Sequence, residues 1–226
     1  GRRRGYGHEY MAPHNLVLTL IGTSLLWVGW FGFNAGSALA SGELAGSAML
    51  NTHIAASVAA LVWMTIEWAT RGKPSVLGIL TGAVAGLGMI TPAAGYVEPW
   101  AALVIGVIAG SVCYWASIVL KNKLGYDDSL DAFGVHGVGG IVGSILVGVF
   151  ATRAINDVAK GQPVGLVDGN GGQILTQLYG VVVIGLFSAV VTWVILKILD
   201  AAIGLRVTQD EEVEGLDTAL HGERVQ

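Results

Sequence analysis

The segment Phe133–Phe150 has the sequence FGVHGVGGIVGSILVGVF and decides how the rest of the chain is interpreted. It is apolar along its length, and the His136 imidazole is its one ionisable group. About 20 consecutive apolar residues span a bilayer as a helix, and an ionisable side chain at that depth is costly and commonly functional. The segment therefore predicts a membrane-spanning helix with His136 as a candidate functional residue. The alternative is a structural histidine bonded to a backbone carbonyl of a neighbouring helix.

Composition extends this interpretation to the whole chain. Hydrophobic residues make up 53% of the 226 residues and charged residues only 12%, which favours a polytopic membrane protein over a soluble domain. The formal net charge is −4 and no basic patch with interleaved aromatics occurs, so we expect no nucleic-acid partner. The single cysteine, Cys113, cannot form an internal disulfide, and no stretch resembles a cleavable signal peptide. The predicted fold class is an all-α, polytopic membrane helix bundle.

Six segments have the length and apolarity of membrane spans. They cover residues 15–38, 47–69, 75–96, 100–120, 132–152 and 173–203. Segment 1–14 precedes the first span, 153–172 is a long connector before the last span at 173–204, and 205–226 is a polar, acidic tail.

Lysines and arginines predict which side of the membrane each connector faces, because cytoplasmic loops carry the excess of positive charge. Placing the amino terminus inside leaves only Arg153 and Lys160 outside. The cytoplasmic side then holds residues 2, 3, 4, 71, 73, 121 and 123. We therefore predict a cell (inner or plasma) membrane protein in which both ends of this segment are cytoplasmic and 153–172 is extracytoplasmic.

Glycines spaced four apart indicate close helix contacts, because residues four apart share one helix face. Such pairs occur at Gly32/Gly36, Gly78/Gly82/Gly86, Gly106/Gly110 and Gly139/Gly143. Together they predict a compact bundle rather than a wide aqueous vestibule.

Polar side chains within the spans are few, which disfavours a sugar or amino-acid transporter with convergent polar groups near the midplane. Glu67 lies one turn before Arg71, so a paired interfacial carboxylate is expected. Asn51 and His53 begin their predicted span and are expected to cap or anchor it rather than bind substrate.

Asp131 precedes His136 by five positions, which separates their directions on a helix by about 140°. A direct carboxylate–imidazole relay within this helix is therefore not expected, and His136 has no local partner. Asp131 instead suits the N-terminal cap of the helix, where its charge meets the positive end of the helix dipole.

Aromatic residues cluster in the outer half of the first span: Trp27, Trp30, Phe31 and Phe33, followed by Ser37. An interfacial aromatic belt is the default explanation. The alternative is a ring stack that narrows a path and offers its π face to a cation, with the Ser37 hydroxyl as an acceptor at the same level.

Several motifs, in order along the chain, resemble signature segments of the ammonium transporter (Amt/Mep/Rh) superfamily, and specifically its bacterial Amt type. They are WFGFNAGS at 30–37, RGKPS at 71–75, TPAAGY at 91–96 and DAFGVHG at 131–137. The tail segments GLRV at 204–207, EGLD at 214–217 and HGE at 221–223 resemble the bacterial cytosolic tail. The resemblance covers essentially the whole chain.

The resemblance implies a fold of eleven spans, built as two inverted five-helix repeats and a long last helix. This chain resembles spans six to eleven plus the regulatory tail, so 15–152 would be the second five-helix repeat. The first repeat would be missing, with its own pore histidine, one gate phenylalanine, and the tryptophan and aspartate at or near the recruitment site. We therefore expect a fragment, a split polypeptide or an edited form that acts together with the N-terminal half.

Site roles also follow from the resemblance. His136 would be the second pore histidine, Phe33 one of two stacked gate rings, and Ser37 the acceptor for ammonium at the outer recruitment site; Leu26 and Trp30 would line the path. The implied function is transport of ammonium or ammonia by a lipid-embedded homotrimer, with no cofactor, metal or enzymatic activity. A trimeric PII-type signalling protein would dock at the cytosolic face.

Two alternatives differ in function class. The first is a non-conducting ammonium sensor or regulatory fragment on the same scaffold. The second is a neutral-gas channel of the Rh kind, which the complete WFGFNAGS motif and the bacterial-type tail argue against.

Overall fold

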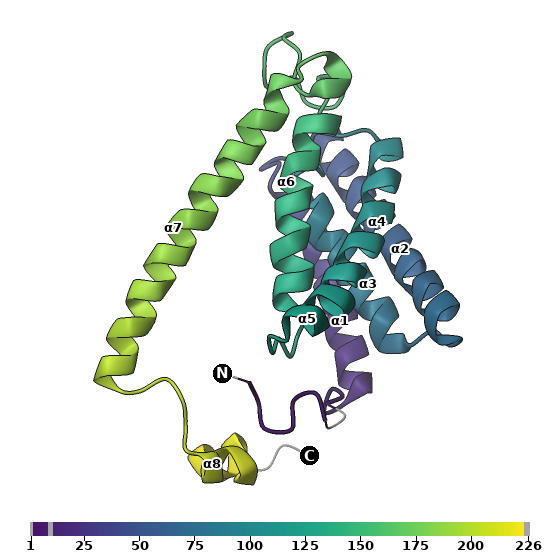
Figure 1. Cartoon of the computed structure of the whole chain (residues 1–226). Coiled ribbons are helices and arrows are strands. Elements are labelled where there is room, and N and C mark those ends of the chain that lie inside the picture. The colour runs from purple at the N-terminus through teal and green to yellow at the C-terminus, as the bar shows by residue number, and fades with distance from the viewer. Residues whose placement is uncertain (1, 9–10, 224–226) are drawn as a thin grey trace. The chain divides into compact units, whose positions relative to one another are not determined.

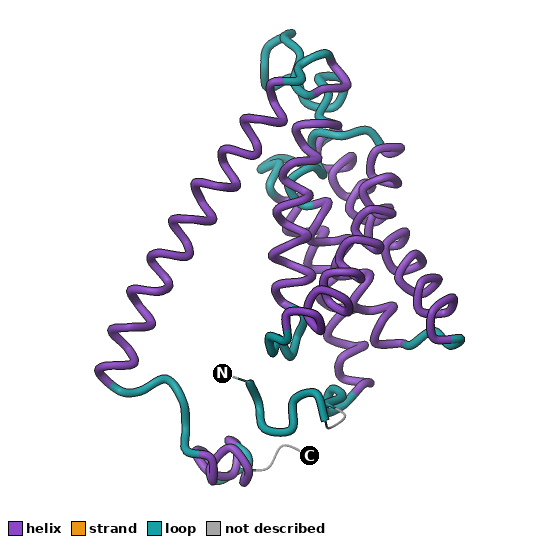
Figure 2. Tube along the Cα trace, viewed as in Figure 1, coloured by secondary structure: helices purple, strands orange, loops and turns teal. Residues whose placement is uncertain are grey.

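A computed structural model describes residues 2–8 and 11–223, and over those residues it contains helices and connectors with no strand (Figures 1 and 2). The long helices are α1 Leu16–Gly36, α2 Glu43–Arg71, α3 Val76–Ile90, α4 Pro99–Tyr114, α6 Val138–Phe150 and α7 Gly172–Ala202. The shorter elements are η1 Trp115–Leu120, α5 Lys121–Leu124, η2 Phe133–Gly137, η3 Leu166–Asp168, α8 Gln209–Glu214 and η4 Asp217–His221. The prediction of an all-α fold is confirmed.

Among the described residues, five helical segments are long and apolar enough to cross a membrane: Leu16–Gly36, Glu43–Arg71, Pro99–Leu124, Phe133–Phe150 and Gly172–Ala202. They coincide with five of the six predicted spans, and the chain is a multi-pass membrane protein.

The third predicted span, 75–96, is wrong in its length. Its helix α3 has 15 residues and ends at Ile90, which at 1.5 Å per residue covers only about 22 Å of an apolar core about 30 Å thick. Pro92 brings no backbone N–H, and residues 91–96 form tight turns in which Ala93 donates to the Ile90 carbonyl and Tyr96 to that of Ala93. The apolar character of 91–96 therefore belongs to a buried turn rather than to another turn of helix.

The chain divides into two compact units, one formed by Ala12–Val181 and the other by Gly1–Met11 with Val182–Gln226. The first unit holds the bundle α1–α6. Its core is rich in alanine, with Ala55, Ala59, Ala85, Ala101 and Ala109 fully buried. Small side chains let the helix axes approach one another, so packing of the bundle rests on close backbone contact.

The glycines of α3 and α4 make these close contacts with α2. A Cβ added to Gly82 would lie 2.6 Å from Trp63 Cβ, and one added to Gly110 would lie 2.7 Å from Val62 Cβ. On α6, Gly143 faces the backbone of Met89 in the same way. The interfaces predicted from these glycine spacings are confirmed.

The predicted contact at Gly32/Gly36 is wrong within this chain. Gly32 and Gly36 both face open space, with no described atom within 4 Å of an added Cβ. Asn34 is the one buried residue of this helix. The glycine spacing therefore gives α1 a face with small side chains, but none of the described residues packs on that face at Gly32 and Gly36.

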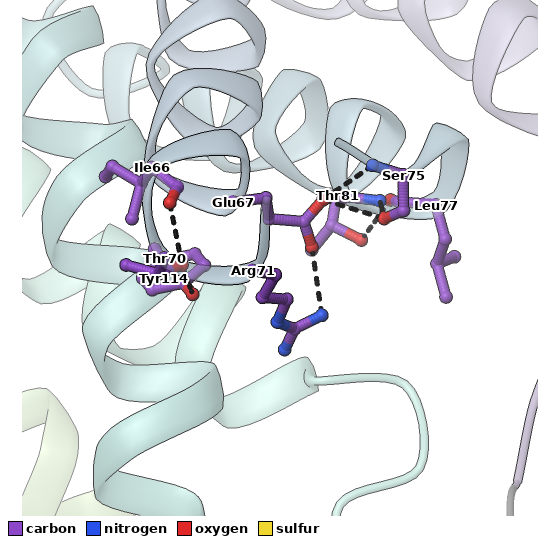
Figure 3. Close-up of polar contacts among 9 residues, drawn as sticks. Ile66, Glu67, Thr70, Arg71, Ser75, Leu77, Thr81 and Tyr114 are labelled. Carbon is purple, nitrogen blue, oxygen red and sulfur yellow. Dashed lines mark hydrogen bonds and ion pairs between the residues drawn. The ribbon is translucent and has the colours of Figure 1, made fainter. Parts of the chain in front are cut away.

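Glu67 confirms the predicted pair with Arg71 and has a further role. Its carboxylate lies 3.3 Å from Arg71 Nη1 and accepts hydrogen bonds from the backbone N–H and the hydroxyl of Ser75, both at 2.8 Å (Figure 3). Ser75 in turn caps α3 by accepting from Gly78 N. Although Glu67 is only 3% exposed, its charge is compensated on both sides of the α2–α3 turn. The carboxylate therefore locks this turn.

The prediction that Asp131 caps its helix is wrong. The backbone N–H groups of Ala132 and Phe133 donate to the Asp128 carboxylate, at 3.0 and 2.8 Å. Asp131 forms an ion pair with Lys121 and has a left-handed backbone conformation with φ of 53°. Asp128 can reach the helix start because the chain turns sharply at Asp131.

Asn51 and His53 do not start their helix, because α2 begins eight residues before Asn51, at Glu43. Asn51 is fully buried and its amide N donates to the carbonyls of Ala94 and Val97, at 2.9 and 2.7 Å. Its anchoring role is confirmed in kind, but it holds the turn after α3 rather than the end of its own helix.

Candidate functional site

A pocket lies where the end of α1, the start of α2, the turn after α3 and the 153–171 connector meet. Its volume is about 150 Å³. Two predicted site residues, Phe33 and Ser37, line it together. The other lining residues are Asn34, Ala38, Leu44, Ala48, Thr91, Ala94, Gly95, Tyr96 and Asn156.

The Phe33 ring is held through its neighbour on α1. Trp30 Nε1 donates to Thr91 Oγ1 at 2.7 Å, and Thr91 Oγ1 donates to the Leu87 carbonyl at 2.6 Å. The Trp30 and Phe33 rings pack with centroids 5.6 Å apart. Phe33 nevertheless remains 61% exposed in this chain, so its other face is open to a second aromatic ring or a cation.

Ser37 contributes an exposed hydroxyl to the pocket. Its hydroxyl proton is directed to the Phe33 carbonyl, with an Oγ–O distance of 2.6 Å. A hydroxyl has one donor and two acceptor lone pairs, so the oxygen keeps its acceptor capacity. An exposed hydroxyl acceptor beside an open aromatic face suits a small cation that carries N–H donors.

The pocket wall is held by a buried hydrogen bond between the lining residue Asn34 and Thr52, which the sequence did not single out. The Asn34 amide N donates to Thr52 Oγ1 at 2.9 Å, and Thr52 donates to the Ala48 carbonyl at 2.6 Å. Thr52 is fully buried and Asn34 is 7% exposed. Their neutral hydrogen bonds tie α1 to α2 and thereby fix the pocket wall.

His136 lies in the π-helical segment η2, and its side chain is exposed in this chain. A Cβ added to Gly88 of α3 would lie 3.9 Å from His136 Nδ1. Within the described residues the ring makes no hydrogen bond, and Asp131 is turned toward Lys121. Among the described residues, Asp131 is thus paired with Lys121 rather than with His136.

A close contact between η1 and η2 sets the position of η2, which carries His136. Gly134 faces Ser117 of η1, whose fully buried hydroxyl has no hydrogen-bond partner in the described part of the chain. π-Helical turns are rare in proteins, and those that occur are often found at functional sites.

The remaining predicted residues are not all brought together. Trp30 borders the pocket through Thr91, whereas Leu26 and His136 do not line it. Leu26 is 43% exposed on α1. Within this chain the outer residues form one cluster, and His136 stands apart from it.

The connector over the pocket is organised by Asp168. Its carboxylate accepts from Thr152 Oγ1 at 2.8 Å and from Arg153 N at 2.9 Å. These hydrogen bonds lower the pKa of Asp168 below its usual value, and the bond from the Arg153 backbone has a larger effect than the bond from the Thr152 side chain.

We expect this connector to loosen in acid. A carboxylate whose folded pKa is lowered contributes stability above its unfolded pKa, and that contribution is lost as pH falls through the folded pKa. Hydrogen exchange of the Arg153 and Val164 amides, corrected for intrinsic rate, should be constant at neutral pH and accelerate below about pH 4. An Asp168→Asn variant should exchange faster than the parent at neutral pH, show no acid step, and approach the parent's rate once Asp168 is protonated. An acid step retained in the variant would contradict the assignment.

The second unit contains the tail and the chain start. The Arg206 guanidinium binds Glu212 at 2.8 Å and donates to the Arg2 carbonyl, also at 2.8 Å. Arg4 N donates to Glu212 Oε1 at 3.3 Å, and Thr208 with Glu211 forms a capping box for α8. The chain start and the tail thus contact one another within this unit. Residues 1, 9, 10 and 224–226, which also belong to these segments, lie outside the described residues.

The model of the Ammonium Transporter Family matches residues 1–226 of the chain. An ammonium transporter of Aquifex aeolicus is 50% identical over 224 residues, covering 99% of this chain and 51% of that protein. One from Bacillus subtilis is 46% identical, covering 94% and 52%. The chain spans about half the length of the curated relatives it matches.

Solved structures show the same fold. Saccharomyces cerevisiae Mep2 superposes with a TM-score of 0.82 at 36% identity, covering 88% of this chain and 45% of its own. A structure titled "Sensor Amt Protein" has a TM-score of 0.82 at 34% identity, covering 92% and 49%. Because the family model matches every residue and the bundle superposes on these structures, the chain belongs to the ammonium transporter family.

Proposed function

We propose that this chain is the C-terminal half of a transporter that moves ammonium or ammonia across a cell membrane. The observation that carries the proposal is the outer pocket, where the open face of Phe33 and the acceptor oxygen of Ser37 lie together. The names of the relatives support the substrate. The activity is transport, with no chemical conversion of the substrate.

The steps follow from solvation. An ammonium ion is attracted to the Phe33 ring and donates to Ser37 while it is still partly hydrated. Carrying an intact cation through an apolar path costs far more than carrying a neutral amine, so the ion releases its proton near the outer gate. Ammonia then crosses the apolar stretch, beside Leu26 and Trp30, and is protonated again at the cytosolic side.

In this proposal, His136 lines the apolar part of the path that ammonia crosses. A neutral imidazole donates at one nitrogen and accepts at the other, so it can pass a small amine along without presenting a charge. Its exposed ring and its lack of a described partner support pairing with a second histidine from the N-terminal half.

The assembly around this half is also part of the proposal. The last helix α7 has no buried residue in its apolar window, which supports its covering by lipid, by the N-terminal half or by neighbouring subunits of a homotrimer. We infer from the distribution of lysines and arginines that both ends of the segment are cytoplasmic, so that the tail would meet a PII-type signalling protein there.

The experiment is saturable uptake of labelled methylammonium by vesicles that contain the complete gene product, with ammonium as competitor. Replacing Ser37 by alanine removes one acceptor for the cation and should raise the half-saturating concentration roughly three- to tenfold. Ser24→Ala is the matched control, because Ser24 on α1 also donates to the carbonyl four residues earlier, at 2.8 Å, and does not line the pocket. Uptake that is absent, or that ammonium fails to inhibit, would contradict the proposal.

A second function, ammonium sensing without conduction, is favoured by the likeness to the sensor Amt structure. It predicts ammonium binding at the same pocket with no accumulation of methylammonium. The uptake measurement separates the two functions.

A further inference from the structure

One lining residue of the pocket comes from the long connector rather than from the helices. Asn156 lines the pocket together with residues of α1, and its side chain is half-buried. Within the described residues its amide makes no hydrogen bond. We propose that Asn156 is a specificity-determining residue of the outer site, whose amide oxygen accepts a hydrogen bond from the entering ammonium ion. This inference rests on the proposed transport function.

The first argument is a count of free acceptors. Ammonium has four N–H donors and loses its water partners as it enters, so the pocket must supply oxygens in their place. Thr91 already takes the Trp30 N–H and donates to Leu87. Asn34 donates to Thr52 through its amide nitrogen, which leaves the Asn34 amide oxygen as an acceptor. Ser37 keeps its acceptor lone pairs, and Asn156 has a carbonyl-type oxygen with two. Without Asn156, Ser37 and Asn34 would leave part of the donors to water.

The second argument is that the connector is held in place by hydrogen bonds to its backbone. Thr152 N donates to the Tyr96 carbonyl at 2.8 Å, which joins the connector to the turn after α3. Thr152 Oγ1 donates to Asp168 at 2.8 Å, and Asn156 N donates to the Thr152 carbonyl at 3.2 Å. Because Thr152 is only 7% exposed, it is a fixed point from which Asn156 reaches the pocket.

The third argument concerns charge. A neutral amide oxygen stabilises a cation without neutralising it, so the ion is bound weakly enough to move on toward the gate. A carboxylate at the same place would bind it more tightly, because hydrogen bonds between ionised partners are about twice as strong as neutral ones. The amide thus suits a site that must both select and release.

The test compares Asn156→Leu and Asn156→Asp in vesicles that contain the complete gene product, using methylammonium uptake competed by ammonium. Asn156→Leu keeps the size and removes the oxygen, so the half-saturating concentration should rise about three- to tenfold with little change in maximal rate. Asn156→Asp should lower the half-saturating concentration, and this gain should shrink as ionic strength rises. The Asp variant also tests the inference if the Leu variant fails to fold.

Gln162→Leu is the matched control, because Gln162 is an exposed amide of the same connector that does not line the pocket. If the parent takes up methylammonium and both Asn156 variants behave like Gln162→Leu, this inference is overturned while the proposed function stands. If the parent shows no uptake that ammonium inhibits, the proposed function falls and this inference with it. A fall in maximal rate alone, at an unchanged half-saturating concentration, would also overturn it.

Discussion

Replacing His136 by alanine should reduce methylammonium uptake by roughly tenfold or more, without loss of folded protein. The imidazole is the one ionisable group in Phe133–Phe150, and the other spans offer few polar groups to replace it. A neutral amine in an apolar path that loses a hydrogen-bond partner pays about 1–3 kcal/mol, which sets this scale. Because the ring is exposed in this chain and makes no hydrogen bond within the described residues, its removal should not disturb the bundle.

The measurement is initial uptake rate against pH, with the amount of monodisperse protein determined in parallel. His136→Gln, which keeps a donor and an acceptor, should recover part of the rate. His53→Ala is the control, since His53 is also an exposed histidine in a span but packs beside Trp27, with ring centroids 5.5 Å apart. Equal rates and selectivity for His136→Ala and the parent would rule out the pore role, and a matching loss in His53→Ala would make the effect nonspecific.

Much of the fold could be predicted because the bilayer restricts the possible structures. Backbone groups in lipid must be satisfied within a helix, so apolar length alone located five of the spans. The Glu67–Arg71 pair could be predicted because its partners lie one helical turn apart. Short-range periodicity carries this kind of information well, and most glycine interfaces followed from it.

The wrong predictions depended on residues far apart in the sequence or on the geometry of turns. Helix α3 ends before the apolar run does, and Asp128 rather than Asp131 caps the next helix because the chain turns sharply between them. Asn51 is bonded to carbonyls more than 40 positions away. Single-sequence periodicity contains no signal for such contacts.

The same distinction between local patterns and long-range contacts applies to the candidate site. Phe33, Ser37 and His136 were identified because their motifs resemble those of a known family, and the pocket brings the first two together. Asn156 was missed because it lies in a polar connector, where an asparagine is unremarkable, and its place depends on the hydrogen bonds of Thr152. Only the three-dimensional path of the connector shows that Asn156 reaches the pocket.

Substituting alanine for Gly86 should destabilise the bundle, although alanine is the better helix former. A Cβ on Gly86 would collide with the Ala55 carbonyl and lie 2.7 Å from Ala56 Cα, both in the backbone of α2. No rotamer change relieves a clash with backbone, so α3 must move away from α2 and loosen the alanine-rich core. Overpacking of this kind costs about 1–3 kcal/mol, which corresponds to a fall in Tm of roughly 2–10 °C. Gly86→Val should cost more.

Gly46→Ala separates packing from helix propensity. Gly46 lies in α2 with no described atom within 4 Å of an added Cβ, so alanine there should gain up to about 1 kcal/mol from propensity alone. The two substitutions are chemically identical but are expected to shift Tm in opposite directions, which a difference in expression or detergent extraction would not produce. Thermal unfolding of the purified variants, followed by size-exclusion chromatography after heating, measures both shifts. If Gly86→Ala were as stable as Gly46→Ala, close backbone contact between α2 and α3 would not be what stabilises the bundle.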